Sequence, residues 1–319
     1  MNATFRVLTV MTPDKRQLRA GIWRQEGAGP RAICVLLNGL TEFLEKYGEV
    51  AEELCARGFI AIGLDWRGQG ASERWRTSNQ ASHVGSFEEY DRDLAALLLQ
   101  AVESVQRDQA APLPVFALAH SMGAHILLRL LHDQPRRLAC AVLVSPMLAV
   151  DLGTYSEATA RLIAGLMNLT GPSSRFVFGF EERDPLTVPF SENRVTSDEA
   201  RFERTRALLK AQPYLRIFGP TFGWLGAAFK SMRRMIRASY AKAITTPLLV
   251  FGASNDRIVH VGAIRDFVKK LPNAHYQEIA GAGHEILMEK DEYRALFWAA
   301  FDTFLEAQLK NPGGFAAKA

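Results

Sequence analysis

The chain alternates short apolar runs with segments of helical spacing, and a stretch of roughly 97 residues interrupts this alternation. Continuous apolar runs that end in polar residues or glycine indicate strands buried on both faces. After an N-terminal hairpin formed by 4–9 and 17–24, the expected strands are 32–37, 59–65, 114–119, 138–144, 247–252 and 274–279. The expected helices are 47–57, 87–108, 122–133, 259–270 and 291–310. Such alternation predicts a mostly parallel sheet with helices on both faces, the α/β class.

The interruption covers residues 147–243 and differs from its flanks in composition. It is rich in aromatic residues, glycine and arginine, and its elements have helical spacing without buried strands between them. Residues 151–243 hold 14 basic and 9 acidic side chains, although the whole chain carries a formal net charge of only +4. Such a charge asymmetry is typical of a separate module. We therefore expect a core of residues 1–146 and 244–319 and an inserted helical cap, or lid, of residues 147–243.

Composition excludes several classes of protein. With 48% hydrophobic and 23% charged residues, the chain of 319 residues is not disordered, collagenous or coiled-coil. The longest clean apolar stretch, near 94–99, is far shorter than the roughly 18 residues needed to span a bilayer. The N-terminus lacks the apolar segment of a secretory signal, and three cysteines suit buried thiols in a reducing compartment. We expect a cytoplasmic protein.

A serine lies in the pentapeptide Ala119-His120-Ser121-Met122-Gly123, between an expected strand and an expected helix. A serine on such a tight turn is exposed, and the N–H groups of the following helix supply positive potential beside it. Small residues two before and two after the serine let the backbones pass closely. The pentapeptide thus predicts a nucleophilic serine, although an ordinary turn serine at a helix start would give the same local pattern.

Asp256 and His284 are candidate partners for Ser121. A hydroxyl is a weak nucleophile until a base removes its proton, and an acid must orient that base. Both residues follow expected strands, so they lie at the carboxyl edge of the sheet, where open α/β sheets bind ligands. The order Ser, Asp, His is the one expected of an α/β hydrolase. We therefore predict a catalytic triad of Ser121, Asp256 and His284.

Acyl transfer also needs backbone donors aimed at the developing oxyanion. The N–H of Met122 and that of Leu40, which follows Gly39 after the first parallel strand, are placed to form this oxyanion hole. Glu42 is expected to anchor the loop by hydrogen bonds. Asp65, Arg67 and Ser72 are expected to fix the loop after their strand. The histidines expected to be structural or solvated are His83, His120, His125, His132, His260 and His275. No histidines have metal-ligand spacing, so the sequence predicts no metal and no cofactor.

Together these motifs resemble the monoacylglycerol lipase and lysophospholipase group of α/β hydrolases, which is often described as serine aminopeptidase-like. The resemblance rests on the segments 38–42, Asp65-Trp66-Arg67-Gly68-Gln69-Gly70-Ala71-Ser72 and 120–123, with the Asp256 and His284 loops, and it covers nearly the whole chain. In that group, Asn38 is usually His and Ala119 is usually Gly. The resemblance implies an α/β-hydrolase fold, the triad named above and an oxyanion hole of Leu40 and Met122. Residues 195–209 and 223–225 resemble, more loosely, the cap of bacterial lysophospholipases.

The insertion carries the candidate substrate-binding residues. Because acyl-chain pockets are mostly apolar, its aromatic residues are candidates to line a tunnel over Ser121, or they form the cap's own core. The four residues selected are Phe178, Phe218, Phe222 and Trp224. Lys230, Arg233, Arg234 and Arg237 have the spacing of one helix face, which suits peripheral contact with an anionic membrane surface or a solvated face. No motif accompanies them that would indicate nucleic-acid binding.

The sequence therefore predicts a serine carboxylic-ester hydrolase that cleaves a single-chain lipid, a lysophospholipid or a monoacylglycerol, through an acyl-serine intermediate. Two alternatives remain at this point. The same triad serves a peptidase or a short-chain carboxylesterase, which would prefer small or polar substrates. The fold could also serve a non-catalytic binding protein, which would bind a ligand without releasing product. An acidic nucleophile would be required for dehalogenase or epoxide hydrolase chemistry, and Ser121 does not supply one.

Overall fold

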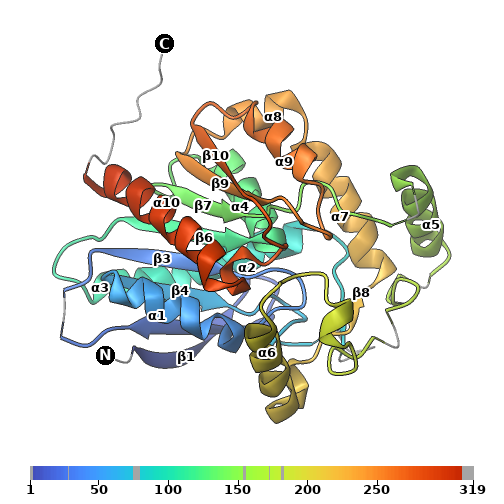
Figure 1. Cartoon of the computed structure of the whole chain (residues 1–319), viewed down its shortest axis with the longest axis horizontal. Coiled ribbons are helices and arrows are strands. Elements are labelled where there is room, and N and C mark those ends of the chain that lie inside the picture. The colour runs from blue at the N-terminus through green and yellow to red at the C-terminus, as the bar shows by residue number, and fades with distance from the viewer. Residues whose placement is uncertain are drawn as a thin grey trace.

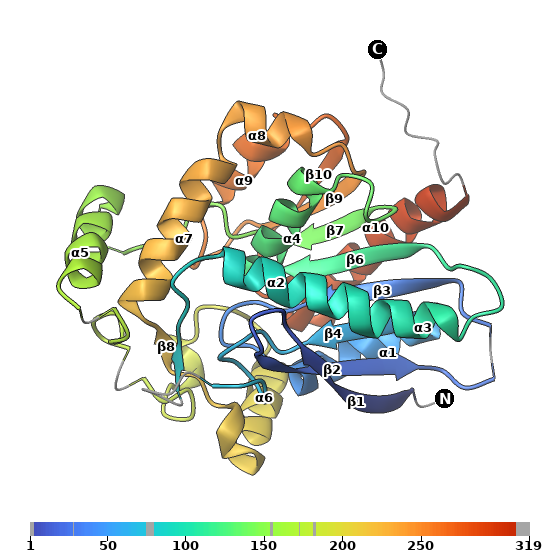
Figure 2. The same ribbon diagram turned by 180° about the vertical axis from the view of Figure 1, so that it is seen from behind.

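An eight-stranded sheet forms the centre of the computed structural model (Figures 1 and 2), which describes residues 3–27, 29–74, 80–153, 156–171, 173–180 and 183–310. The strand order is β1-β2-β4-β3-β6-β7-β9-β10. The strands are β1 (Thr4–Met11), β2 (Gln17–Arg24), β3 (Ala32–Leu37), β4 (Phe59–Leu64), β6 (Val115–His120), β7 (Ala141–Val144), β9 (Leu248–Ala253) and β10 (Ala274–Ile279). β1 and β2 pair antiparallel, β2 pairs antiparallel with β4, and all later pairs are parallel. The predicted mostly parallel sheet is confirmed.

The apolar runs form the strands that are covered on both faces. Every residue of β3, β4, β7 and β9 is buried, as expected of continuous apolar runs in a helix-covered sheet. β7 is shorter than the sequence predicts. Leu138 and Cys140 are buried as their run indicates, and β7 itself begins at Ala141. The backbone contact with β6 starts two residues earlier, where the Ala139 N–H donates to the Val115 carbonyl oxygen at 2.8 Å.

Helices cover both faces of the sheet. The helices outside residues 147–243 are α1 (Gly48–Ala56), α2 (Glu88–Leu97), α3 (Glu103–Arg107), α4 (Ser121–Asp133), α9 (Val261–Val268) and α10 (Asp291–Lys310), with 3₁₀ turns at Leu44–Tyr47 and Ile286–Met288. α1 and α10 lie on the face seen in Figure 1, and α2, α3 and α4 lie on the face seen in Figure 2. The expected single helix 87–108 contains a π-helical turn at Leu98–Val102 between α2 and α3. α1 ends before Gly58, whose φ of 81° favours glycine, as the sequence predicts.

The segment between β7 and β9 is mainly helical. It contains α5 (Glu157–Leu169), α6 (Glu199–Ala211), α7 (Phe222–Met235) and α8 (Ala238–Ala243), with 3₁₀ turns at Phe190–Glu192 and Pro213–Leu215. Ser156, Asp198 and Thr221 cap α5, α6 and α7 by accepting hydrogen bonds from backbone N–H groups. The expectation that no buried strand interrupts these helices is wrong: the two-residue strand β8 (Gly219–Pro220) is buried and pairs with β5 (Ala81–Ser82).

The helices of this segment differ in how they meet the core. The buried side chains of α7 and α8, among them Trp224, Met232 and Tyr240, belong to the same hydrophobic cluster as α2, α4 and the sheet. In contrast, Ala164 is the one buried residue of α5, and its Leu162 and Leu169 are 64% and 85% exposed. The division into a core of 1–146 and 244–319 and a cap of 147–243 stays a prediction. Among the described residues, no helix combines the length and the apolar character needed to cross a membrane.

Candidate active site

Ser121 is the first residue of α4 and directly follows the last residue of β6. Its φ of 51° lies in the left-handed region, which turns the chain sharply from strand to helix. The close passage of α4 over the end of β3 requires Gly123, because a Cβ there would lie 2.5 Å from the carbonyl oxygen of Asn38. The strained serine and the absent side chain at Gly123 together give the turn expected of the pentapeptide.

The structure brings Ser121, His284 and Asp256 into one hydrogen-bonded chain. His284 Nε2 lies 3.0 Å from Ser121 Oγ, and His284 Nδ1 lies 2.7 Å from Asp256 Oδ2. Asp256 follows β9 and His284 follows β10, so both reach the carboxyl edge of the sheet where Ser121 lies. A base hydrogen-bonded to a hydroxyl and oriented by a carboxylate can take up the proton of that hydroxyl.

Hydrogen bonds keep the Asp256 carboxylate charged. Burial acts to raise the pKa of Asp256, but hydrogen bonds from His284 and from the backbone outweigh it, so the pKa is lowered. The backbone donors are the N–H groups of Ile258 and Val259, which lie 2.8 and 2.9 Å from Asp256 Oδ1. Ser121 is 7% exposed and His284 is 3% exposed. The carboxylate is therefore ionised at neutral pH and the reacting atoms are largely shielded from water.

The loop after β3 lies against Ser121. A Cβ built on Gly39 would lie 3.2 Å from Ser121 Cβ, so this loop and the serine are in contact. Gln69 fixes the loop by donating to the Gly39 carbonyl oxygen at 3.1 Å and accepting from the Thr41 N–H at 3.0 Å. Met122 is the second residue of α4, where N–H groups have no acceptor within the helix. Leu40 is half-buried and packs against the core.

A buried polar cluster supports the loop from behind, and we define it as Glu42, Lys46, Tyr47, His120 and Glu285. Glu42 accepts hydrogen bonds from the Gly39 N–H and from Lys46 Nζ and Tyr47 Oη, both at 2.7 Å. His120 Nδ1 lies 3.0 Å from Glu42 Oε2, and Lys46 Nζ also donates to Glu285 at 2.6 Å. These contacts agree with the expectation that Glu42 anchors the loop.

The cluster also reaches the backbone of the candidate base, which the sequence analysis missed. His120 Nε2 lies 3.3 Å from the carbonyl oxygen of His284. Burial acts to lower the pKa of His120, but the Glu42 carboxylate outweighs it and raises the pKa. The pKa of Glu42 is lowered well below its usual range, because Lys46 and His120 outweigh the opposing effect of burial. The spacing of Lys46, four residues after Glu42, was the available sequence signal.

The loop after β4 is held by Asp65. Its carboxylate accepts from the N–H groups of Leu44 and Ala71, at 2.9 and 2.8 Å, and pairs with Arg19. Burial raises the pKa of Asp65 to about 6, although Arg19 opposes the shift. These contacts agree with the expected structural role of Asp65.

The four aromatic residues selected as substrate-binding candidates fall into three separate ring pairs. Phe178, which is 66% exposed, packs against Phe222 with ring centres 5.0 Å apart. Phe218 is half-buried and stacks on Phe176 at 6.5 Å. Trp224 is buried beside Phe87 at 5.9 Å, within the core cluster. Their role in contacting an acyl chain stays a prediction, and Trp224 belongs to the core cluster.

Within the ranges that the structure describes, no group of three or more histidine, cysteine, aspartate or glutamate residues is arranged to hold a metal ion.

The chain is similar to known lipid hydrolases. The chain is 28% identical over 284 residues to a probable lysophospholipase L2 of Haemophilus influenzae, covering 89% of this chain and 87% of that protein. It is 24% identical over 273 residues to a monoacylglycerol lipase of Mycolicibacterium smegmatis, covering 85% of this chain and 87% of that protein. A soluble variant of monoglyceride lipase from Saccharomyces cerevisiae has a similar fold, with a TM-score of 0.74, 18% identity and coverage of 97% of this chain and 96% of that chain.

A family profile covers most of the chain. Residues 28–291 match the family described as serine aminopeptidase, S33. The match spans every parallel strand of the sheet and the segments that carry Ser121, Asp256 and His284. The family resemblance expected from the sequence is confirmed. The chain thus belongs to the serine aminopeptidase S33 family and is a serine hydrolase with the α/β-hydrolase fold.

Proposed function

We propose that Ser121, His284 and Asp256 form a catalytic triad that hydrolyses the carboxylic ester of a single-chain lipid. The observation that carries the proposal is the continuous hydrogen-bonded chain from Ser121 Oγ through His284 to Asp256, with distances of 3.0 and 2.7 Å. The contact of the Gly39 loop with Ser121 supports an oxyanion hole formed by the N–H groups of Leu40 and Met122. Backbone donors placed in this way stabilise the charge that develops on the ester oxygen.

The reaction proceeds in two halves. Ser121 Oγ attacks the ester carbonyl carbon while its proton passes to His284 Nε2, and Asp256 stabilises the resulting imidazolium. The carbon–oxygen bond to the alcohol then breaks, and the alcohol leaves with the proton from His284. Water next attacks the acyl-serine, giving its proton to His284, which returns it to Ser121 as the carboxylic acid departs. Each half conserves the proton, and the second regenerates the free enzyme.

The substrate class rests on the relatives and on the insertion. The curated relatives are named lysophospholipase and monoacylglycerol lipase, and both names denote esters with one acyl chain. We propose residues 147–243 as a cap over the core, with Phe178, Phe218, Phe222 and Trp224 as candidates to contact the acyl chain. Phe178 and Phe218 are the more accessible of the four.

Peripheral contact with a membrane surface is the second part of the proposal. The exposed cations on and just after α7 are Lys230, Arg233, Arg234 and Arg237, and α5 exposes Leu162, Leu166 and Leu169. α5 packs against α7, so apolar and cationic side chains lie on neighbouring helices. Exposed apolar groups beside cations suit an interface with anionic lipid.

Fatty acid release tests the activity directly. Lysophosphatidylcholine and a monoacylglycerol are supplied side by side to the wild-type chain, to Ser121→Ala and to Ser239→Ala, which changes an exposed serine of α8. We expect release by the wild type and by Ser239→Ala, and a loss of several orders of magnitude in Ser121→Ala. Equal release by Ser121→Ala would contradict the assignment of the nucleophile.

A peptidase remains the alternative because the family description names an aminopeptidase. Aminoacyl anilides and short-chain esters added to the same assay separate the two functions. Cleavage of the anilides with no release from either lipid would favour the peptidase. Stoichiometric binding of lipid with no release from any substrate would favour a binding protein.

A further inference from the structure

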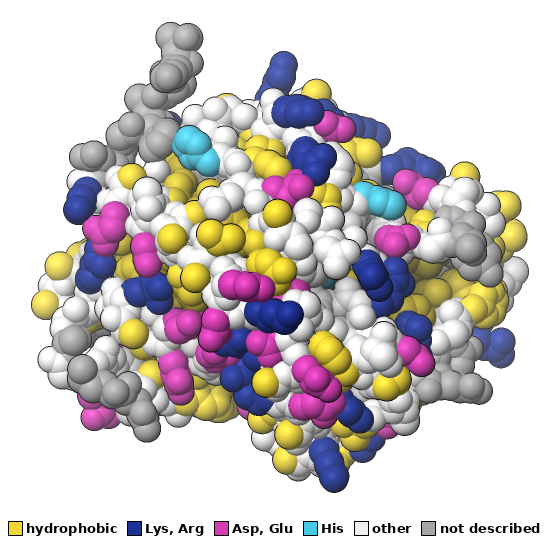
Figure 3. Space-filling view, viewed as in Figure 1, with side chains coloured by type: hydrophobic (Ala, Val, Ile, Leu, Met, Phe, Trp, Pro, Cys, Tyr) yellow, Lys and Arg dark blue, Asp and Glu magenta, His cyan; other side chains and the backbone are white. Residues whose placement is uncertain are grey.

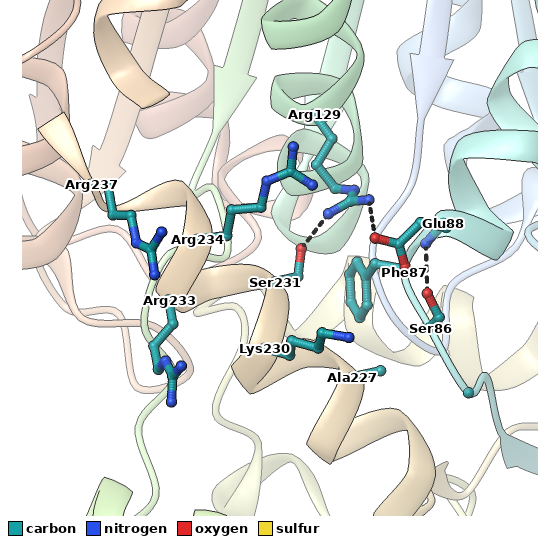
Figure 4. Close-up of a pocket in the computed structure, with 11 residues that line it drawn as sticks. Ser86, Phe87, Glu88, Arg129, Ala227, Lys230, Ser231, Arg233, Arg234 and Arg237 are labelled. Carbon is teal, nitrogen blue, oxygen red and sulfur yellow. Dashed lines mark hydrogen bonds and ion pairs between the residues drawn. The ribbon is translucent and has the colours of Figure 1, made fainter. Parts of the chain in front are cut away.

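A pocket of about 240 Å³ lies between the start of α2, the middle of α4 and the outer face of α7 (Figure 4). The side chains that give it charge are Arg129, Lys230, Arg233, Arg234, Arg237 and Glu88. We propose that this pocket binds the phosphate group of a phosphomonoester, at a site separate from the triad. Arg129 follows Ser121 by eight residues of α4, which places it about 12 Å further along the helix axis. The pocket includes none of the triad residues.

The four α7-side cations carry more positive charge than Glu88, the one carboxylate that lines the pocket, can balance. Lys230, Arg233, Arg234 and Arg237 are exposed and, among the described residues, pair with no carboxylate; Arg234 lies over the Tyr240 ring at 5.5 Å. Several cations elsewhere are paired; for example, Arg201, Arg204 and Arg294 all pair with Glu49. On the face that Figure 3 shows, acidic and basic side chains intermingle around α6 and α1. Like charges gathered around one pocket repel one another, and a bound anion relieves that repulsion.

Hydrogen bonds fix the inner wall of the pocket. Arg129 is 5% exposed and donates to Asp91 at 2.6 Å, to Glu88 at 3.1 Å and to Ser231 Oγ at 2.9 Å. Ser231 also lies 2.8 Å from His125 Nε2. Figure 4 shows Arg234 extending toward Arg129, while Lys230 extends toward Phe87 and Glu88. Because Asp91 and Glu88 already neutralise Arg129, the charge of a ligand would be met by the α7 cations over a preorganised floor.

The number of cations and the size of the pocket select the ligand. Five cationic side chains and one carboxylate line it, so a single carboxylate ligand would leave most of the excess charge unmet. A phosphomonoester carries close to two negative charges and presents three oxygens to arginine forks. The volume lies just below the roughly 300 Å³ at which pockets for drug-sized ligands begin, which suits a small group. The N–H groups of Gly85 and Ser86 already donate to Glu89, so the cations are what the pocket offers.

The pocket leaves room for the rest of the ester. A second cavity of about 310 Å³ shares Lys230 and Arg233 with the first and continues along α7 to Gly165 and Asn168 of α5. The phosphate can therefore belong to a soluble ester or to the head group of a lipid whose remainder lies along α5. The chemistry of recognition is the same in both cases.

Binding measurements without any catalytic readout test the proposal. The variant Lys230→Gln, Arg234→Gln, Arg237→Gln removes three of the unpaired cations, all exposed, so the fold is retained and is checked by circular dichroism. The matched control carries Arg6→Gln, Arg24→Gln and Arg107→Gln, which remove the same charge from exposed positions on β1, β2 and the end of α3. Calorimetric titrations with glycerol 3-phosphate, and with glycerol as its uncharged counterpart, are made in chloride buffer at constant ionic strength.

A second arm uses phosphatidylcholine vesicles that contain phosphatidic acid, phosphatidylglycerol or neither, measured by sedimentation. Saturable binding of glycerol 3-phosphate at one site, weakened at least about tenfold in the triple variant and unchanged in the control, supports a soluble ester. Retention on phosphatidic acid vesicles but not on phosphatidylglycerol vesicles of equal charge, with the same dependence on the triple variant, supports a lipid head group. Equal retention on both anionic vesicles, without binding of glycerol 3-phosphate, overturns the pocket and leaves only the surface contact proposed above. Absence of both by the wild type, or equal loss in the triple variant and the control, overturns the proposal.

Discussion

The substitution Glu42→Gln tests the anchor of the candidate oxyanion loop without changing a residue of the triad. Glu42 accepts from four donors, namely the Gly39 N–H, Lys46, Tyr47 and His120, and all four are buried with it. Glutamine keeps one oxygen and places an NH₂ group where a second acceptor stood. Its oxygen can accept about two of the four hydrogen bonds, so about two donors lose their acceptor.

The magnitude follows from those contacts. An unmet buried donor costs about 1–3 kcal/mol, so we expect Glu42→Gln to lower the free energy of unfolding by about 2–6 kcal/mol. The Gly39 N–H is one of the donors affected, and Gly39 positions Leu40. Loss of one oxyanion donor costs about 10²–10³ in kcat. The proposed oxyanion donor is the Leu40 N–H, which acts on charge that develops in the transition state. We therefore expect kcat to fall while KM changes little.

Steady-state kinetics on a chromogenic ester, measured below the melting temperature of each variant, give the two constants. The matched control is Glu45→Gln, which removes a carboxylate from the same loop region, where it pairs with Arg19 at 2.7 Å without contacting Gly39. Arg19 keeps Asp65 as a partner, as Lys46 keeps Glu285. A folded Glu42→Gln enzyme with a kcat within about threefold of Glu45→Gln would refute the reasoning, because the loop would then need no anchor.

Three further outcomes are expected. Burial lowers the pKa of His125 to about 3. Below about pH 6.5 the His125 imidazole is therefore protonated in the unfolded state and stays neutral in the folded state. Between pH 7 and pH 5, the free energy of unfolding measured in urea should fall by about 2 kcal/mol more in the wild type than in His125→Gln. Gly123→Ala should lower stability by about 1–3 kcal/mol in thermal unfolding, because its Cβ would meet the carbonyl oxygens of Asn38 and Leu37 at 2.5 and 2.7 Å. Asp256→Asn should lower kcat by about 10⁴-fold in single-turnover assays, since an amide holds His284 in the wrong tautomer.

Each of these outcomes has a discriminating comparison. Equal pH dependence of unfolding in the wild type and His125→Gln would mean that the imidazole is protonated in the folded state. Gly165→Ala is the counterpart of Gly123→Ala, because its Cβ would meet nothing within 4 Å, and it should stabilise α5. A destabilised Gly165→Ala would contradict the steric argument for Gly123. An Asp256→Asn enzyme with normal kcat would remove the orienting role of that carboxylate.

The order of strands and helices could be predicted from the sequence because the parallel strands are buried on both faces. A run such as Ala32–Leu37 has no polar position, so its hydropathy alone marks a covered strand. The loop positions of Asp256 and His284 follow from the same argument, since each comes after a buried strand. Ser121 also follows a buried strand, so all three candidate residues are expected at the carboxyl edge of the sheet.

The polar contacts behind the candidate oxyanion loop could not be predicted in this way. The bond between His120 and the His284 carbonyl joins residues 164 positions apart, and no local pattern marks it. The aromatic residues of the insertion illustrate a second limit. Hydropathy shows that Trp224 and Phe178 are apolar, but Trp224 packs with Phe87 in the core while Phe178 is exposed. Which surface an apolar side chain meets depends on the tertiary arrangement.

The packing of α7 determines where this chain can exchange segments with its relatives. A Cβ on Gly223 would lie 2.6 Å from the His83 ring, and Trp224 and Met232 share the cluster of α2 and α4. A chimera that takes all of residues 147–243 from a relative would therefore place a foreign helix in the position of α7. The hydrophobic core would then pack badly around that helix. A chimera that replaces only α5, in which Ala164 is the one buried residue, preserves that core. It also keeps the Val195 carbonyl oxygen, which accepts from the Glu285 N–H, and the hydroxyl of Ser197, which donates to Glu289. Exchange of segments is thus freer at α5 than at α7 or at the segment that contacts the His284 loop.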